Sequence, residues 1–193
     1  YIDQMAKYKY NVLQLHLTDD QGWRVEIKKH PGLTETGAFR NPQTGPNGPD
    51  NGYYTQQQLK DLIQYAADRN VEIIPELDIP GHTVAVLATY PELGCTHTDT
   101  IQKIMGKTVD LMLCANNDKV YTVYDDVIKE IAELFPSPKI HLGGDEAVIE
   151  KNWTKCDRCQ SLMKQLGYTK ESQLMNYFFD KILASVRKYG KEP

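Results

Sequence analysis

The sequence predicts an α/β protein of the (β/α)8 TIM-barrel type, of which this chain of 193 residues supplies about half. Short apolar, β-rich segments alternate with amphipathic helical patterns, which is typical of parallel strands joined by right-handed crossovers. The predicted strands begin about 60 to 70 residues apart, and the surplus length lies in the loops that follow them. Because a complete barrel usually needs about 250 residues, we expect residues 1–193 to form a partial barrel domain that is incomplete at both ends.

Three segments are predicted to be buried strands, because each is short, apolar and rich in β-branched residues or Leu. They are residues 11–17 (NVLQLHL), 71–77 (VEIIPEL) and 139–142 (KIHL). The last three residues, Lys191-Glu192-Pro193, are interpreted as the start of a fourth strand.

Helical periodicity fills the intervals between these strands. Apolar residues recur at the i, i+3, i+4, i+7 spacing in residues 59–67, 120–131 and 175–186. Thr55 and Gln58 predict a capping box in front of the first of these helices, and prolines at 136 and 138 predict the end of the second. Residues 2–10 are interpreted as the end of a helix that leads into the first strand.

Composition excludes several classes of protein. The 22 Lys+Arg and 26 Asp+Glu give a net charge of −4, and without a basic cluster a nucleic-acid partner is not expected. No apolar run exceeds the five residues of 84–88, so no membrane-spanning helix is expected either. Four cysteines are too few for a scaffold built on disulfides.

Polar residues follow each predicted strand. The carboxyl ends of the strands of a parallel barrel meet at one mouth, so we expect these side chains to lie close together. Clustered and buried carboxylates are one way to hold a carboxylic acid protonated near neutral pH. The residues concerned are Asp19 and Asp20 after the first strand, Asp78 and His82 after the second, and Asp145 and Glu146 after the third.

Each of these residues also has an ordinary structural explanation. A single carboxylate after a strand is often a helix N-cap or a solvated loop residue, and His16 and His141 fit core histidines equally well. Mg²⁺ or Zn²⁺ bound by the carboxylates is a competing chemistry, but the adjacent Asp145-Glu146 pair is a poor chelate unless Gly143-Gly144 bends the strand end. We therefore expect no cofactor and no metal.

Three sequence blocks resemble the family 20 glycoside hydrolases, the β-N-acetylhexosaminidases. They are NVLQLHLTDDQGWR at 11–24, PELDIPGH at 75–82 and HLGGDE at 141–146, and GYYT at 52–55 is also similar. The resemblance spans essentially the whole chain and implies strands 2–4 of the barrel. It further implies an exo-acting enzyme that releases terminal non-reducing GlcNAc or GalNAc from an oligosaccharide or glycoconjugate by a retaining, substrate-assisted mechanism through an oxazolinium ion.

The resemblance also implies a role for each candidate residue. Glu146 would be the general acid and base, and Asp145 would orient the 2-acetamido group of the substrate. Asp19 and His82 would form a relay to Glu146, with Asp78 orienting the His82 ring. Asp145, Glu146 and His82 would contact the substrate, and Asp19 rather than its neighbour is expected to face the pocket. Trp23 fits either a wall for a sugar face or ordinary packing.

Several substrate-holding residues of the family have no counterpart in residues 1–193, namely an Arg on the first strand and aromatic and acidic residues on the later strands. We therefore expect little activity from this chain alone, and a partner in the missing barrel half or in a second copy. The alternative function is a non-catalytic carbohydrate-binding or inactive fragment of the same scaffold.

Cysteines complete the set of predictions. The resemblance implies a disulfide between Cys95 and Cys114, closing a loop worth roughly 3 kcal/mol, with two buried free thiols as the alternative. The Cys156-x-x-Cys159 motif has no second CxxC to complete a zinc site, so zinc is not expected. The disulfide would favour an exported protein, whether extracellular, periplasmic or lysosomal, and Asn152-Trp153-Thr154 matches a glycosylation sequon.

Overall fold

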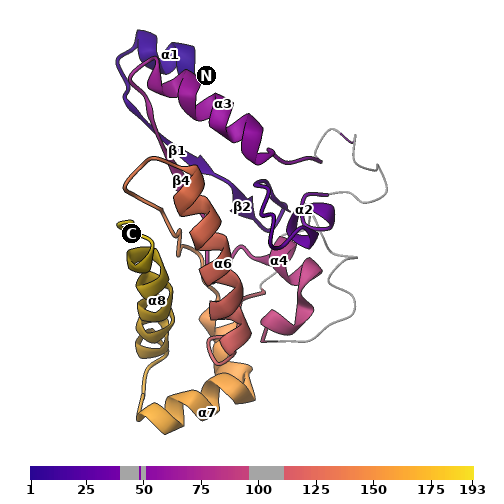
Figure 1. Cartoon of the computed structure of the whole chain (residues 1–193). Coiled ribbons are helices and arrows are strands. Elements are labelled where there is room, and N and C mark those ends of the chain that lie inside the picture. The colour runs from indigo at the N-terminus through magenta and orange to yellow at the C-terminus, as the bar shows by residue number, and fades with distance from the viewer. Residues whose placement is uncertain (40–47, 49–50, 96–110) are drawn as a thin grey trace.

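The structure is a computed structural model that describes residues 1–39, 48, 51–95 and 111–193. Its centre is a pair of parallel strands, β1 (Val12–His16) and β4 (Glu72–Glu76), whose ends pair as Val12 with Glu72 and His16 with Glu76 (Figure 1). Parallel pairing of segments so far apart in sequence requires a crossover, and α3 (Gln56–Ala67) supplies it.

The third predicted strand lies on the other side of β4. His141 forms a parallel bridge with Glu76, and its backbone N–H donates to Pro75 O at 2.9 Å. Glu192 in turn bridges Lys139 in parallel. The segments therefore lie side by side in chain order, all parallel. The first two predicted strands are confirmed, and the third and the start of the fourth are present as parallel bridges. Residues 139–142 form only isolated bridges, because Pro138 lacks an N–H and Gly143 turns the chain away at φ +63°.

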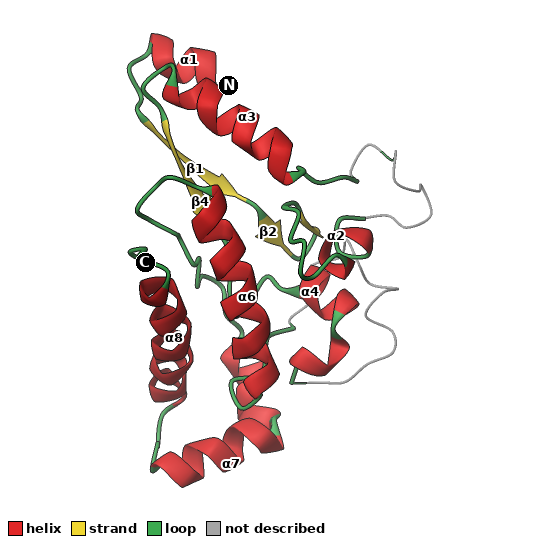
Figure 2. Ribbon diagram, in the orientation of Figure 1, coloured by secondary structure: helices red, strands yellow, loops and turns green. Residues whose placement is uncertain are grey.

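The predicted helices are present. They are α1 (Ile2–Lys7), α3, α6 (Asp118–Leu134) and α8 (Glu171–Lys188). Thr55 accepts a hydrogen bond from Gln58 N, and the Gln58 side chain accepts from Thr55 N, so the predicted capping box holds the start of α3. Helices α6 and α8 pack side by side (Figure 2).

Shorter elements fill the loops that follow the strands. A two-residue hairpin follows β1, α4 follows β4, and two turns of 3₁₀ helix with α7 follow residues 139–142. These elements are β2 (Thr18–Asp19), β3 (Gly22–Trp23), α2 (Gly32–Glu35), α4 (Val84–Thr89), η2 (Pro91–Leu93), η3 (Ile149–Lys151), η4 (Trp153–Lys155) and α7 (Asp157–Leu166).

Burial separates the two faces of β1. Leu13 and Leu15 pack against the apolar core, whereas Gln14 and His16 lie on the opposite face and are exposed. Trp23 is 1% exposed and donates its indole N–H to Val25 O at 2.6 Å, so it is a packing residue and does not form a wall for a sugar. Among the described residues, no helix is long and apolar enough to cross a bilayer.

Candidate active site

Side chains from three strand ends meet around His82. Its Nδ1 lies 3.1 Å from Asp19 Oδ1, and its Nε2 lies 3.4 Å from Glu146 Oε2 and 4.0 Å from Asp145 Oδ2. These four residues follow three different strands, and the parallel arrangement of those strands brings them together. The predicted proximity is therefore confirmed.

Asp19 and Asp20 have separate tasks. Asp19 faces His82 and also places Oδ2 3.2 Å from His16 Nε2. The Asp20 side chain is buried, and its Oδ1 accepts the Val84 N–H at 3.1 Å, at the first residue of α4. Asp19 lies nearer to His82 than Asp20 does, since Asp20 Oδ2 is 3.8 Å from His82 Nδ1, and Asp20 also anchors the helix that follows His82. That Asp19 faces the substrate pocket stays a prediction.

Asp78 holds the turn that carries Asp145 and Glu146. Its Oδ1 accepts the Gly144 N–H at 2.9 Å, and its own N–H donates to Thr18 Oγ1 at 2.9 Å. A Cβ at Gly143 would collide with the Asp78 carboxyl group, so only glycine permits this close approach. The predicted role of Asp78 in orienting the His82 ring stays a prediction: a carboxyl oxygen of Asp78 lies within 4.8 Å of a ring nitrogen of His82, and the Asp78 side chain also holds the glycine turn.

Two residues of the cluster have left-handed backbone conformations. His82 has φ +50° and Glu146 has φ +49°, values that non-glycine residues adopt at a cost in free energy. Such conformations persist where surrounding packing fixes them, and they concentrate at functional sites. Here they aim the two side chains toward each other.

Burial and neighbouring charges shift the pKa of Asp78 and of His82. Burial raises the pKa of Asp78 to about 6. The hydrogen bond from the Gly144 N–H opposes this rise, and the negative charge of Asp145 adds to it. Burial lowers the pKa of His82, but the surrounding Asp carboxylates, Asp19 first, raise it to a net value above the usual one. The site therefore stabilises a positive imidazolium next to Glu146.

Exposure differs sharply across the cluster. The His82 side chain is 15% exposed, whereas those of Asp145 and Glu146 are 69% and 77% exposed. Among the described residues, His82 Nε2 is buried without a hydrogen-bond partner, since Glu146 lies close but off the line of the N–H bond. The buried ring thus presents one nitrogen toward two carboxylates that remain open to a ligand.

Comparison with known proteins places this geometry in a family. Residues 1–193 match the family described as glycosyl hydrolase family 20, catalytic domain. The chain belongs to this family.

Curated and solved members of family 20 resemble the chain throughout its length. It is 41% identical over 191 residues to a beta-hexosaminidase of Porphyromonas gingivalis, covering 99% of this chain and 24% of that protein. A crystal structure of a beta-N-acetylhexosaminidase superposes on 100% of the chain and 41% of its own length, with a TM-score of 0.91 and 38% identity. The exo beta-N-acetylglucosaminidase from Vibrio harveyi, in complex with N-acetylglucosamine, gives a TM-score of 0.83 and 40% identity over 98% of this chain and 31% of its own. The chain thus spans less than half the length of these relatives.

A second polar cluster, on the face of β1 that carries Gln14 and His16, was not predicted. Glu76 is 6% exposed; its Oε1 lies 3.3 Å from Nδ1 of both His16 and His141, and its Oε2 accepts from Gln14 Nε2 at 2.6 Å. The two histidines are therefore neither packed in the apolar core nor in contact with Glu146. The alternation of polar Gln14 and His16 with Leu13 and Leu15 was the signal that could have revealed this face.

Some of these side chains could also hold a cation. Ligand atoms of Asp19, Asp20 and His82 lie within 4.8 Å of one another, as do those of Asp78, His82 and Asp145. Carboxylates with one imidazole are a ligand set for Mg²⁺, Mn²⁺ or Zn²⁺. The oxygens of Asp19, Asp20 and Asp78 already accept hydrogen bonds or ion pairs within the protein, which favours an acid–base cluster.

The cysteine predictions need correction. All four thiols are free, so the predicted Cys95–Cys114 disulfide is wrong, and Cys95 instead contacts Cys159 with sulfur atoms 3.7 Å apart. No second CxxC motif exists, as predicted, but the single cysteines Cys95 and Cys114 lie beside Cys156 and Cys159. Asn152 of the sequon is 4% exposed, with its amide donated to Val148 O at 3.0 Å, and is closed to glycosylation in this fold.

Proposed function

We propose that this chain forms part of the catalytic domain of an exo-acting β-N-acetylhexosaminidase. In the whole protein the strands described here would be strands 2–4 of a (β/α)8 barrel, with Glu192 beginning the next. The observation that carries the proposal is His82, held between Asp19 at 3.1 Å and Glu146 at 3.4 Å at the carboxyl ends of parallel strands. Family membership and the name of the Porphyromonas relative support the same activity.

Glu146 is the proposed general acid. Its exposed carboxyl group reaches solvent and would donate a proton to the glycosidic oxygen as the bond to the leaving group breaks. The acetamido oxygen of the substrate would attack the anomeric carbon and form the oxazolinium ion, in line with the substrate-assisted scheme of this family. Glu146 would then take a proton from the water that opens this ring, which restores the acid and retains the configuration.

The Asp19–His82 pair would tune that acid. Asp19 Oδ1 lies 3.1 Å from His82 Nδ1, and this ion pair favours the charged form of the ring. The imidazolium would then stabilise the Glu146 carboxylate once its proton has left, and release that stabilisation when water returns a proton. Positioned acid–base groups of this kind contribute about 10²–10⁴-fold to the rate.

Asp145 would orient the acetamido group. Adjacent residues in a regular strand point to opposite sides, but the Gly143–Gly144 turn and the left-handed Glu146 bring both carboxylates to the same mouth. One can then face the leaving group and the other the N-acyl arm. Asp78 would act through the turn it holds and is thus a positioning residue.

The substrate proposed is an oligosaccharide or glycoconjugate that ends in GlcNAc or GalNAc. The Vibrio harveyi relative was solved with N-acetylglucosamine, which supports this class. The rest of the sugar pocket would come from the other barrel half or from a second copy of the chain. Export of the protein stays a prediction, which cell fractionation would test. The disulfide that favoured this prediction is absent, because Cys95 and Cys114 are free thiols.

The test is Glu146→Gln in the longest form of the protein that contains residues 1–193. We expect kcat on a chromogenic N-acetylglucosaminide to fall by about 10²–10⁴-fold with little change in KM. Glu150→Gln, an exposed carboxylate four residues further on, is the matched control and should retain the wild-type rate. A Glu146→Gln variant with near wild-type kcat would contradict the assignment.

A thiazoline inhibitor that mimics the oxazolinium ion separates an enzyme from a carbohydrate-binding relic. Tight binding that is lost in Asp145→Asn supports the proposed mechanism. Binding of free sugar alone, with no affinity for the thiazoline, would favour the non-catalytic alternative.

A further inference from the structure

The four cysteines of the chain form one cluster although they lie far apart in sequence. Cys114 Sγ lies 3.7 Å from Cys159 Sγ and 4.0 Å from Cys156 Sγ, and Cys95 Sγ lies 3.7 Å from Cys159 Sγ. All four sulfur atoms lie within 4.8 Å of one another. Three of the residues are buried and Cys95 is partly exposed.

We propose that Cys95, Cys114, Cys156 and Cys159 bind one zinc ion in a closed structural site. Zn–thiolate bonds of about 2.3 Å in a regular tetrahedron separate the sulfur atoms by about 3.8 Å. The observed contacts of 3.7 to 4.0 Å match that separation. A disulfide would instead bring two sulfur atoms to about 2.05 Å. Four sulfur atoms that all lie within 4.8 Å of one another, with the three closest contacts at 3.7 to 4.0 Å, fit a single ion better than two bridges.

The backbone around the cluster is arranged for such a site. Gly94 and Leu113 form an antiparallel bridge, which places Cys95 and Cys114 on adjacent segments. Cys156 is the N-cap residue of α7 and Cys159 lies in its first turn. The first N–H groups of a helix favour negative charge, and the two-residue gap of the CxxC motif is typical of zinc ligands.

A positive side chain accompanies the cluster, because Arg158 stands inside the CxxC motif directly before Cys159. Arg158 is fixed there by its donation to Gly94 O at 2.6 Å. Zinc binding would release the thiol protons, and the positive side chain would partly offset the charge of four thiolates on one divalent ion.

The cluster lies between the loops that carry the candidate site. Leu113 N–H donates to Pro80 O at 3.0 Å, two residues before His82. The Trp153 indole N–H donates to Leu113 O at 2.8 Å, from the segment that follows Glu146. A zinc ion in this position would tie the loop after β4 to the loop after residues 139–142. With four protein ligands it would have no open position for substrate, so its contribution would be to hold these loops.

Metal content tests the proposal without reference to activity. The longest form of the protein that contains residues 1–193, purified with zinc under reducing conditions, should hold one zinc per chain by elemental analysis. Cys159→Ser should lose at least about tenfold of that zinc, since one of four ligands is removed. Ser161→Ala, an exposed residue of the same helix, and His82→Ala, which disrupts the carboxylate cluster, should both keep it.

Two measurements on the unmutated protein keep the test decisive if Cys159→Ser does not fold. Replacement of zinc by Co²⁺ should give the visible bands of a tetrahedral cobalt thiolate. The intact mass after alkylation of the denatured, metal-free protein should show four free thiols. Protein without zinc, zinc lost in His82→Ala, iron in place of zinc, or a mass showing disulfides would each overturn the proposal.

Discussion

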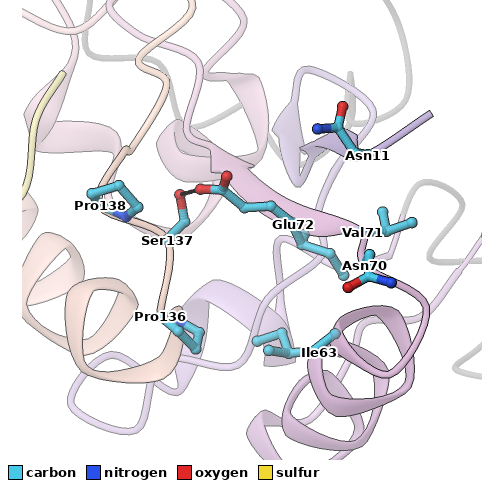
Figure 3. Close-up of a pocket in the computed structure, with 10 residues that line it drawn as sticks. Asn11, Ile63, Asn70, Val71, Glu72, Pro136, Ser137 and Pro138 are labelled. Carbon is cyan, nitrogen blue, oxygen red and sulfur yellow. Dashed lines mark hydrogen bonds between the residues drawn. The ribbon is translucent and has the colours of Figure 1, made fainter. Parts of the chain in front are cut away.

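The two ends of the parallel strands differ in how their polar groups are satisfied. At the amino ends, Ser137 Oγ donates to Glu72 Oε1 at 2.6 Å (Figure 3). The same oxygen accepts the Lys139 N–H at 3.1 Å. Lys191 Nζ donates to Phe135 O and Ser137 O at 2.6 and 2.7 Å. Ser137 and Glu72 line a cavity of about 510 Å³, together with Asn11, Asn70 and Pro136.

At the carboxyl ends, by contrast, hydrogen-bonding capacity remains unused. His82 Nε2 has no hydrogen-bond partner among the described residues, Asp145 and Glu146 are exposed, and His82 and Glu146 have left-handed backbones. Proteins tolerate such features where a ligand later supplies the missing contacts. The cavity at the amino ends also has a left-handed residue, Asn70 with φ +56°, but among the described residues no buried side-chain polar atom in its lining lacks a hydrogen-bond partner, so a hollow alone does not identify an active site. In barrel folds that end of the strands serves stability and the opposite end serves chemistry.

The largest effect is expected from Gly143→Ala. Its added Cβ would collide with the Asp78 carboxyl group, and the turn carrying Asp145 and Glu146 would have to move. A displacement of about 1 Å in catalytic groups can cost about 10²-fold in rate, so we expect kcat/KM on a chromogenic N-acetylglucosaminide to fall by at least that factor.

Gly190→Ala is the matched control at the amino ends. Gly190 has φ +72°, close to the +63° of Gly143, but no described atom lies within 4 Å of its added Cβ. Both variants carry the conformational cost of a left-handed alanine, about 1–2 kcal/mol, and only one carries the collision. Equal loss of activity in the two variants would show that general destabilisation explains the effect.

Much of the fold could be predicted from local sequence. The spacing of Leu59, Leu62 and Ala66 and the capping pair of Thr55 and Gln58 set α3 through contacts within a few residues, so the pattern was sufficient. The meeting of Asp19, His82 and Glu146 was predictable once the strands were taken as parallel, because their carboxyl ends then share one edge.

The cysteine cluster and the partners of Asp78 and Glu76 could not be predicted, because they depend on contacts between residues far apart in the sequence. Cys95 and Cys114 are single cysteines, and only the chain path brings them to the CxxC motif. The bond of Asp78 to Gly144 was not predicted, because it arises from the left-handed Gly143 turn 65 positions later. Glu76 was missed because an acidic residue near the end of an apolar strand gives no sign of the histidines on either side.

A smaller effect is expected from Asp78→Asn, and it depends on pH. Folding raises the pKa of Asp78 from 3.8 to about 6, so its contribution to stability is fully present below pH 4 and is lost as the pH rises to about 6. Asparagine is neutral throughout and can still accept the Gly144 N–H. With about 1.4 kcal/mol per pKa unit, the variant should be more stable than wild type at pH 7 by about 1–3 kcal/mol and similar to it at pH 4.

Urea unfolding at several pH values measures this difference. Asp180→Asn, at an exposed position of α8, is the matched control and should follow the wild-type pH profile. If Asp78→Asn were less stable than wild type at pH 7, the ionised carboxylate would be a net stabilising group, and the burial argument for its raised pKa would fail.

The smallest effect is expected at the amino ends, from Ser137→Ala. The variant removes the donor to Glu72 and the acceptor of the Lys139 N–H, but Glu72 is exposed and water can replace the lost bond. We expect a loss of about 1 kcal/mol in the free energy of unfolding, measured by urea denaturation, with kcat/KM unchanged. Ser172→Ala, an exposed serine at the start of α8, should change neither quantity. A fall in kcat/KM for Ser137→Ala at temperatures where the protein stays folded would mean that the two ends are coupled through the strands, and the division between a stabilising end and a chemical end would not hold.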